Sequence, residues 1–258
     1  MLEMVYEYSI ARCEAAKKKF NLVNEVAEIY KKKHSYSKYI GECNRLCRLH
    51  KPSSDKDFLD KYLQYAEEHK DLPIKHRGLT KIELYNDALK YFNEINETLG
   101  DKFTTTFEEC LDCLVCHIIT ETYTGYLAED IAFNRLVNNG FTCEHTTDYY
   151  QDSEYGIDFF TYIKGEKYAV QVKPMKFLLS HKQHVKDDRR ALAVKYELAY
   201  KKYKVKTLYV IHNTEINNGE RSCEIMVKDN NEKKFLFTFD ELFEVNGIIP
   251  KNSTFKEF

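Results

Sequence analysis

Three polar residues in the segment 156–174 have the types and the spacing that metal-dependent hydrolysis requires. Asp158 precedes an apolar and aromatic run, and Gln171 and Lys173 lie two positions apart after the turn-forming residues 164–166. Because alternate residues of a strand point to the same side, Gln171 and Lys173 share one face. Oxygen ligands suit a hard cation such as Mg²⁺. A lysine beside that cation can orient or deprotonate a water that attacks a phosphodiester.

A β-hairpin must position these residues. The sequence predicts strands over 156–163 and 167–173, joined by a three-residue turn at Lys164-Gly165-Glu166. This turn places Asp158 beside Gln171. The other elements expected around the hairpin are a helix over 125–139 ended by Asn138-Asn139-Gly140, a short strand over 141–147, a basic helix within 177–204, an apolar strand over 207–212, and a second hairpin made of 223–227 and 235–239 around Asn230-Asn231.

The first 120 residues have a helical pattern instead. Apolar residues at helical spacing predict helices over 1–33, 54–70, 79–99 and 106–123. Ser53 and Ser54 are expected to cap the second of these, and Thr80 with Glu83 forms a capping-box pattern at the start of the third. We therefore expect an α/β protein with a helical region over residues 1–120 and a mixed sheet flanked by helices over residues 121–258.

The composition excludes several classes of protein. The chain has 258 residues, of which 43% are hydrophobic and 31% charged, so it has enough apolar material for a core and is not a disordered or collagenous chain. It contains no apolar run long enough to span a membrane. Glu3 and Glu7 also make the first residues unlike a secretory signal. These features lead us to expect a soluble, cytoplasmic protein without a membrane segment.

The charge is small overall but unevenly distributed. The net charge is −2, yet residues 121–163 contain eight acids and one base, and residues 164–206 contain 13 bases and four acids. An acidic block beside a basic block could hold a cation next to a polyanion. Each block could equally be an ordinary solvated surface.

The hairpin residues resemble a known motif. Asp158, twelve intervening residues and then Gln171-Val172-Lys173 resemble the PD-(D/E)xK motif of the restriction-endonuclease-like nucleases. Gly156-Ile157-Asp158 is similar to a common variant of the first half. The helix before the hairpin carries Glu129, where many members of the superfamily have a further acidic residue. The expected order α-β-β-β-α-β also matches, so the resemblance covers about residues 120–215.

The resemblance implies a restriction-endonuclease-like core and a set of site residues. Mg²⁺ would be held by Asp158, Gln171, the backbone carbonyl of Val172 and Glu129, and Lys173 would act in catalysis with them. The sequence departs from the motif at Gln171, since an amide offers a carbonyl oxygen but no negative charge. This leaves the number of bound metal ions open. It also makes Glu129 or Glu154 more important as a compensating acid.

The resemblance further implies a type II restriction endonuclease that hydrolyses double-stranded DNA at a short specific sequence. Residues 1–120 would then serve DNA wrapping, recognition or dimerisation. A homodimer and a cognate DNA methyltransferase are expected partners, and the recognition sequence stays open. The alternatives are a junction-resolving or repair nuclease of the same fold, and a non-catalytic DNA-binding protein with a decayed site. The residues expected to contact DNA are Lys176, His181, Lys182, Gln183, His184, Lys186, Arg189 and Arg190, with a second basic patch at Arg45, Arg48, His50 and Lys51.

The cysteines permit two interpretations. Cys43, Cys47, Cys110, Cys113 and Cys116 have spacings that could bind zinc or an iron–sulfur cluster. In a reducing compartment they are not expected to form disulfides. The simpler interpretation, which we favour, is small apolar side chains on buried helix faces.

Overall fold

The computed structural model describes residues 6–33, 43–146, 151, 154–179, 183–217, 219–227, 235–238 and 242. The chain forms two compact units. The helical unit comprises Met1–Leu127 and Ile216–Arg221, and the sheet unit comprises Ala128–Glu215 and Ser222–Phe258. The sequence predicts the boundary after residue 120, whereas the helical unit extends to Leu127. No helix in the described ranges is long and apolar enough to cross a membrane.

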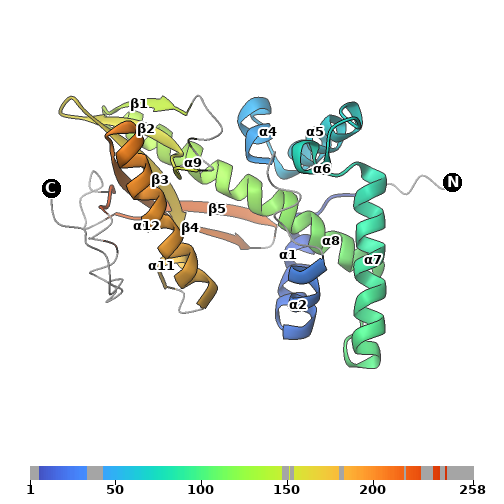
Figure 1. The fold of residues 1–258 in the computed structure, drawn as a ribbon. Helices are drawn as coiled ribbons and strands as arrows, with labels where there is room; N and C mark the ends of the chain where they lie inside the picture. Colours follow the sequence, from blue (N-terminus) through green and yellow to red (C-terminus); the bar gives the residue numbers. More distant parts are fainter. Residues whose placement is uncertain are drawn as a thin grey trace. The chain divides into compact units, whose positions relative to one another are not determined.

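The helical unit is built from the helices labelled in Figure 1. They are α1 (Ile10–Asn21), α2 (Asn24–Lys33), α4 (Cys43–His50), α5 (Asp55–Glu68), α6 (Ile74–Arg77), α7 (Lys81–Leu99), the 3₁₀ turn η1 (Gly100–Lys102), α8 (Phe107–Val115), the π-helical turn η2 (Cys116–Thr120) and the start of α9 (Glu121–Asn138).

Two of these helices begin as the sequence predicts. The Ser54 side chain accepts a hydrogen bond from the Asp57 backbone N–H at the start of α5. Thr80 and Glu83 form the expected capping box at the start of α7. Both caps satisfy backbone N–H groups that have no partner inside the helix.

Two other helix predictions were wrong in their bounds. The helix expected over 1–33 is interrupted between Asn21 and Asn24, because Leu22 and Val23 form a turn that separates α1 from α2. The helices expected over 106–123 and 125–139 are not separated. Instead η2 connects α8 to α9, and Gly125 lies inside α9, where a Cβ would meet nothing within 4 Å apart from its own stretch of helix.

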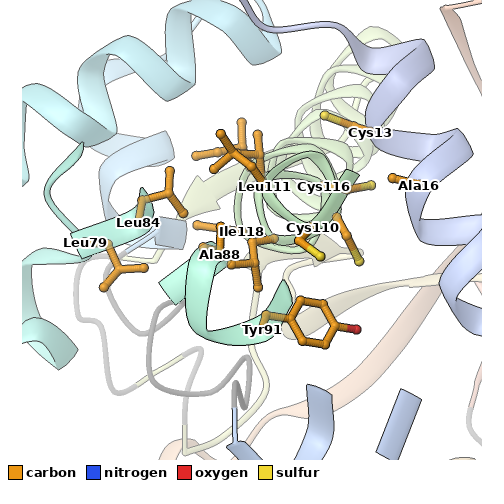
Figure 2. Packing of buried hydrophobic residues seen from close by; sticks show 14 of the residues in the cluster. Cys13, Ala16, Leu79, Leu84, Ala88, Tyr91, Cys110, Leu111, Cys116 and Ile118 are labelled. Carbon is orange, nitrogen blue, oxygen red and sulfur yellow. The ribbon is translucent and has the colours of Figure 1, made fainter. Parts of the chain in front are cut away.

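The core of the helical unit surrounds α8. Figure 2 shows Cys110 and Leu111 of α8 between Cys13 and Ala16 of α1 and Leu84, Ala88 and Tyr91 of α7. These side chains are all at most 4% exposed. Burial of small thiols and alanines at the contacts lets the helices approach closely, which agrees with the packing interpretation of the cysteines.

The described residues of the sheet unit form a mixed five-stranded sheet in the order β1-β2-β3-β4-β5. Its strands are β1 (Thr142–His145), β2 (Phe159–Ile163), β3 (Glu166–Pro174), β4 (Lys206–Asn217) and β5 (Glu220–Ile225). The pairs β1–β2 and β2–β3 are antiparallel, whereas β3 and β4 are parallel. The expected α/β class is therefore confirmed.

The hairpin of β2 and β3 is confirmed, with a shorter turn than predicted. Glu166 pairs with Ile163, so only Lys164 and Gly165 lie between the strands. Their φ angles are 52° and 86°. A two-residue turn with positive φ at both positions is type I′, which matches the natural twist of a hairpin.

Helices cover both faces of this sheet, as Figure 1 shows for α9 and α12. On one face, Ala128, Ala132 and Leu136 of α9 pack with Val170, Val172 and Val210. On the other face, residues of α11 (Met175–Leu179) and α12 (Gln183–Tyr203) pack with the alternate strand residues Ala169, Tyr209 and Ile211. Gln171 and Lys173 alternate with Val170 and Val172, so they belong to the α12 face.

The last predicted hairpin was wrong. The strand expected over 223–227 overlaps the end of β5, which follows β4 in the chain and lies next to it in the sheet. Phe237 exchanges backbone hydrogen bonds with Tyr209 of β4 rather than with β5. Asn230 and Asn231 lie outside the described residues. The long basic helix expected within 177–204 is confirmed as α12, and the short helix α11 precedes it.

Candidate functional site

Asp158 is held against β3 by both its backbone and its side chain. It precedes β2 and is 7% exposed. Its N–H donates to the carbonyl oxygen of Val170 at 2.9 Å, and its Oδ2 accepts a hydrogen bond from the Val172 N–H at 2.7 Å. A backbone N–H bound to a buried carboxylate compensates part of the cost of its burial. The carboxylate is thereby fixed next to the segment 171–173.

Gln171 is positioned by a glycine. Gly156 has φ +62°, and a Cβ added to it would lie 2.6 Å from Nε2 of Gln171 and 3.3 Å from Cδ of Lys195 on α12. The Gln171 side chain is buried at 4% exposure. The amide therefore lies against the bare Cα of Gly156, and any larger residue there would displace it.

Lys173 is less buried than Gln171 and pairs in register with Ile211 of β4. Within the described residues it has no ion pair. The structure thus places Asp158, Gln171 and Lys173 on one face of two adjacent strands, where β2 begins and β3 ends.

The remaining expected metal ligands are less clearly placed. Val172 directs its side chain into the core under α9, while its N–H binds Asp158. Glu129 is half-buried on α9, next to Ala128 of that same core, and Glu154 is exposed in a turn. No three His, Cys, Asp or Glu side chains of the described residues are grouped as metal ligands. A metal role for Glu129 therefore stays a prediction.

The residues expected to contact DNA are only partly described. Lys176 is exposed on α11. His181 and Lys182 lie outside the described residues, and so do the side chains of Gln183, His184, Lys186, Arg189 and Arg190, whose backbone forms the first turns of α12. Of the second basic patch, His50 and Lys51 are exposed and Arg48 is half-buried, whereas the side chain of Arg45 is not described.

His212 is a candidate that the sequence interpretation missed. It is 5% exposed, pairs in register with Pro174, and has its Nδ1 2.8 Å from the Thr214 hydroxyl oxygen. Burial, together with the charges of Lys176 and Lys173, lowers the pKa of His212 from 6.5 to about 4. The sequence feature that could have identified His212 is its position at the end of the apolar run 207–212.

The cysteines behave as core residues. Cys43, Cys47, Cys110, Cys113 and Cys116 are buried and form no disulfide, and burial raises the pKa of Cys110 to about 12. A thiol that resists ionisation is a poor metal ligand and a poor nucleophile. The described residues accordingly support packing as the role of these side chains.

Comparisons with protein-family models, with curated proteins and with solved structures give no match for this chain. A functional interpretation therefore depends on the residues and on their geometry. The arrangement that such an interpretation must explain is a fixed carboxylate, a buried amide and a lysine on adjacent strands.

Proposed function

We propose that this protein is a Mg²⁺-dependent endonuclease that hydrolyses phosphodiester bonds of double-stranded DNA. One observation carries the proposal: the hydrogen bond of 2.7 Å between the Val172 N–H and Oδ2 of Asp158. It joins the two halves of the motif, which are separated by twelve residues in the sequence. A hairpin with an unrelated exposed aspartate would not require this contact.

The order of elements supports the proposal. Apart from α11 and the helical residue Gln151 between β1 and β2, the described elements of the sheet unit run in the order α9, β1, β2, β3, α12 and β4. This order agrees with the α-β-β-β-α-β order of the restriction-endonuclease-like core. That specific fold is part of the proposal, since many α/β proteins share a mixed sheet with helices on both faces.

The donor set is chemically suited to Mg²⁺. This ion is commonly held by one or two carboxylates, with waters and substrate phosphates completing its shell. Asp158 would supply the carboxylate, and Gln171 and the Val172 carbonyl would supply neutral oxygens. When bound, the ion would supply charge neutralisation and activation of a water. Lys173 would hold that water and stabilise charge on the reacting phosphate.

A type II restriction endonuclease is the form of the proposal that we favour. The excess of basic residues over 164–206 supports a DNA-facing role for α11 and α12. A homodimer would suit a palindromic target, and a cognate DNA methyltransferase would protect the host. The missing charge at Gln171 instead favours a second candidate, a DNA-binding protein without catalytic activity.

Cleavage of plasmid DNA in Mg²⁺ tests the proposal. The wild-type protein should give a discrete set of fragments, and Asp158→Asn should cut at least a hundredfold more slowly, while its melting temperature stays close to wild type. The asparagine oxygen can still accept the Val172 N–H, so the fold is spared. The matched control is Asp130→Asn, which changes an exposed acid on α9 and should cut normally.

Lys173→Ala provides an independent arm of the same test. It should slow cleavage at least a hundredfold with little change in DNA affinity. Lys201→Ala, at an exposed lysine on α12, is the control. DNA binding without any cleavage by the wild-type protein would favour the non-catalytic candidate, and a smear of products would favour a repair-type nuclease. Normal cutting by Lys173→Ala would contradict the assigned site.

A further inference from the structure

The Gln171 amide is nearly buried and makes no hydrogen bond to the described residues. Gln171 is 4% exposed, and neither its carbonyl oxygen nor its nitrogen has a hydrogen-bond partner there. Burial of an amide without hydrogen bonds leaves the loss of its hydration uncompensated, so the group suits a ligand that uses it. The buried carboxylate of Asp158 on the neighbouring strand makes a hard cation a fitting ligand.

Only one orientation of this amide leaves its oxygen for a metal ion. The carbonyl oxygen can bind Mg²⁺, whereas the NH₂ group is a hydrogen-bond donor and not a ligand. The terminal torsion of a glutamine is soft and roughly two-fold, so covalent geometry does not choose between the two orientations. Because no hydrogen bond to a described residue chooses either, the orientation depends on packing.

Gly156 and Lys195 are packing neighbours of the amide. Nε2 of Gln171 is 2.6 Å and Cδ of Gln171 is 3.4 Å from the place where a Cβ of Gly156 would lie. The carbonyl oxygen is farther from that place than both atoms, so the amide turns its nitrogen toward Gly156 and its oxygen away. Cδ of Lys195 is 3.3 Å from the same place. The Lys195 chain therefore passes beside the nitrogen end of the amide.

The spacing along α12 explains why Lys195 faces the sheet. Leu192 and Ala199 are 6% and 0% exposed and pack with residues of the strands. Lys195 lies between them at helical spacing, so all three share one side of the helix. Lys195 itself is half-buried. A lysine at such a position can cover its neighbours with its methylene groups and keep its charge at the edge of the core.

We propose that Lys195 is a positioning residue of the candidate site. Its methylene chain holds the Gln171 amide against Gly156, in the orientation that leaves the carbonyl oxygen for Mg²⁺. The inference rests on the proposed function for its choice of Mg²⁺. It adds to that function a residue of α12 that acts through Gln171. Loss of a group that orients a metal ligand typically lowers metal affinity or activity by about 10- to 100-fold.

The orientation of the amide can be observed without metal or DNA. In protein labelled with ¹⁵N-glutamine, NMR detects the side-chain NH₂ groups of the four glutamines, and Gln171→Glu identifies the signal of Gln171 by its loss. The Gln171 NH₂ protons should show NOEs to the Hα protons of Gly156 and to the methylene protons of Lys195. Absence of an NOE to Gly156 would overturn the assigned orientation.

Two variants of Lys195 isolate the packing of its chain. Lys195→Ala and Lys195→Met both lack the charge, but only methionine retains a long unbranched side chain. Mn²⁺ binding, measured by electron paramagnetic resonance without DNA, should be about tenfold weaker in Lys195→Ala than in Lys195→Met. Lys201→Ala, at an exposed lysine of the same helix, should bind Mn²⁺ like wild type. Equal Mn²⁺ affinities of the alanine and methionine variants would overturn the proposal.

Gln171→Glu tests whether Lys195 acts through the amide. The two oxygens of a carboxylate are equivalent, so the orientation of the group no longer matters. In the Gln171→Glu background, Lys195→Ala and Lys195→Met should therefore bind Mn²⁺ equally well. A difference of about tenfold that persists in this background would show that Lys195 supports the fold rather than the amide, which contradicts the proposal.

The cleavage assay separates this inference from the proposed nuclease. A protein that shows these Mn²⁺ affinities but never cuts DNA would retain the positioning role and lose the nuclease. A protein that cuts DNA, while Lys195→Ala and Lys195→Met require the same Mg²⁺ concentration, would retain the nuclease and lose the positioning role. A wild-type protein that binds no Mn²⁺ would contradict both.

Discussion

Charged side chains in the helical unit form ion pairs, whereas two lysines at the end of β3 have no ion-pair partner among the described residues. In the helical unit, Asp55 forms a two-bond ion pair with Arg221 at 2.6 and 2.8 Å, and both side chains are at most 10% exposed. Asp112 likewise contacts Arg12 at 3.2 Å. In the sheet unit, the ammonium groups of Lys173 and Lys176 have no such partner among the described residues.

The difference separates charges that maintain the fold from charges that are available to a ligand. An ion pair inside a protein costs desolvation energy, and removal of one partner leaves the other uncompensated. Buried pairs are therefore expected to matter for stability. Cations without a counter-charge contribute little to stability, so an effect of their removal should appear in binding or catalysis.

Loss of Asp55 should give the largest effect on stability. Asp55→Ala leaves Arg221 buried without its carboxylate, and we expect the free energy of unfolding to fall by about 3–5 kcal/mol. Asp60→Ala, on the same helix, removes an exposed acid paired with Lys56 and should change stability by about 0.5 kcal/mol or less. Urea denaturation measures both. Similar values for the two variants would remove the distinction between buried and exposed pairs.

Gly156→Ala should damage the candidate site and the fold together. The backbone at φ +62° disfavours alanine by about 1–3 kcal/mol, and the new Cβ would displace the Gln171 amide. A displaced group at the reacting centre could reduce cleavage about a hundredfold. Gly140→Ala is the matched control, because its φ is +85° but no atom lies within 4 Å of a Cβ there. If both variants lose cleavage equally, backbone strain alone explains the loss.

The two units should respond to acid in different pH ranges. His212 has its pKa lowered from 6.5 to about 4, so the stability that its neutral form contributes is lost as pH falls from 6.5 to 4. Burial favours protonation of Glu121, but hydrogen bonds and charges from His117 and Lys17 outweigh it and lower the pKa of this carboxyl from 4.5 to about 2. Its contribution is lost as pH falls from 4.5 to 2.

One variant at each residue tests whether His212 and Glu121 cause the loss of stability in these two pH ranges. Thermal melting against pH should show a smaller decline between pH 6.5 and 4 for His212→Gln, and a smaller decline between pH 4.5 and 2 for Glu121→Gln. Curves for both variants that remain parallel to the wild-type curve would show that other groups determine the acid sensitivity.

The smallest expected effect concerns a helix cap. Thr80→Ala removes the hydrogen bond of 3.3 Å from the Glu83 N–H to the Thr80 hydroxyl, and we expect a loss of about 1 kcal/mol in the free energy of unfolding. Thr80→Ser retains a hydroxyl and should recover most of it. A loss above about 3 kcal/mol would indicate that Thr80 also supports the neighbouring pair of Arg77 and Glu83.

Local chemistry explains which elements the sequence predicted well. The hairpin turn required a glycine with positive φ, and Gly165 supplies it. The cap at Thr80 depends only on a residue three positions away. In contrast, the interruption of the first helix at Leu22 and Val23 was missed, because buried Phe20 and Val26 continue the apolar pattern across it.

The parts that sequence could not provide are contacts between distant residues. Phe237 pairs with Tyr209 rather than with β5, and nothing local distinguishes these two partners. The position of His212 depends on the parallel register that places it beside Pro174. The approach of the Gln171 amide to Gly156 likewise depends on tertiary packing, although both residues belong to the motif segment. Periodicity and motif spacing contain none of this information.

The hairpin tip at Ile216–Arg221 has a consequence for the order of folding during synthesis. The helical unit contains the first 127 residues, but it also contains this tip, which includes the Arg221 partner of Asp55. A ribosome releases residues in chain order, so Asp55 emerges long before Arg221 does. The helical unit consequently cannot complete its buried ion pair until β4 and the start of β5 have been translated. A fragment that ends at residue 127 would retain Asp55 without its partner, so we expect it to be less stable than the same unit within the whole chain.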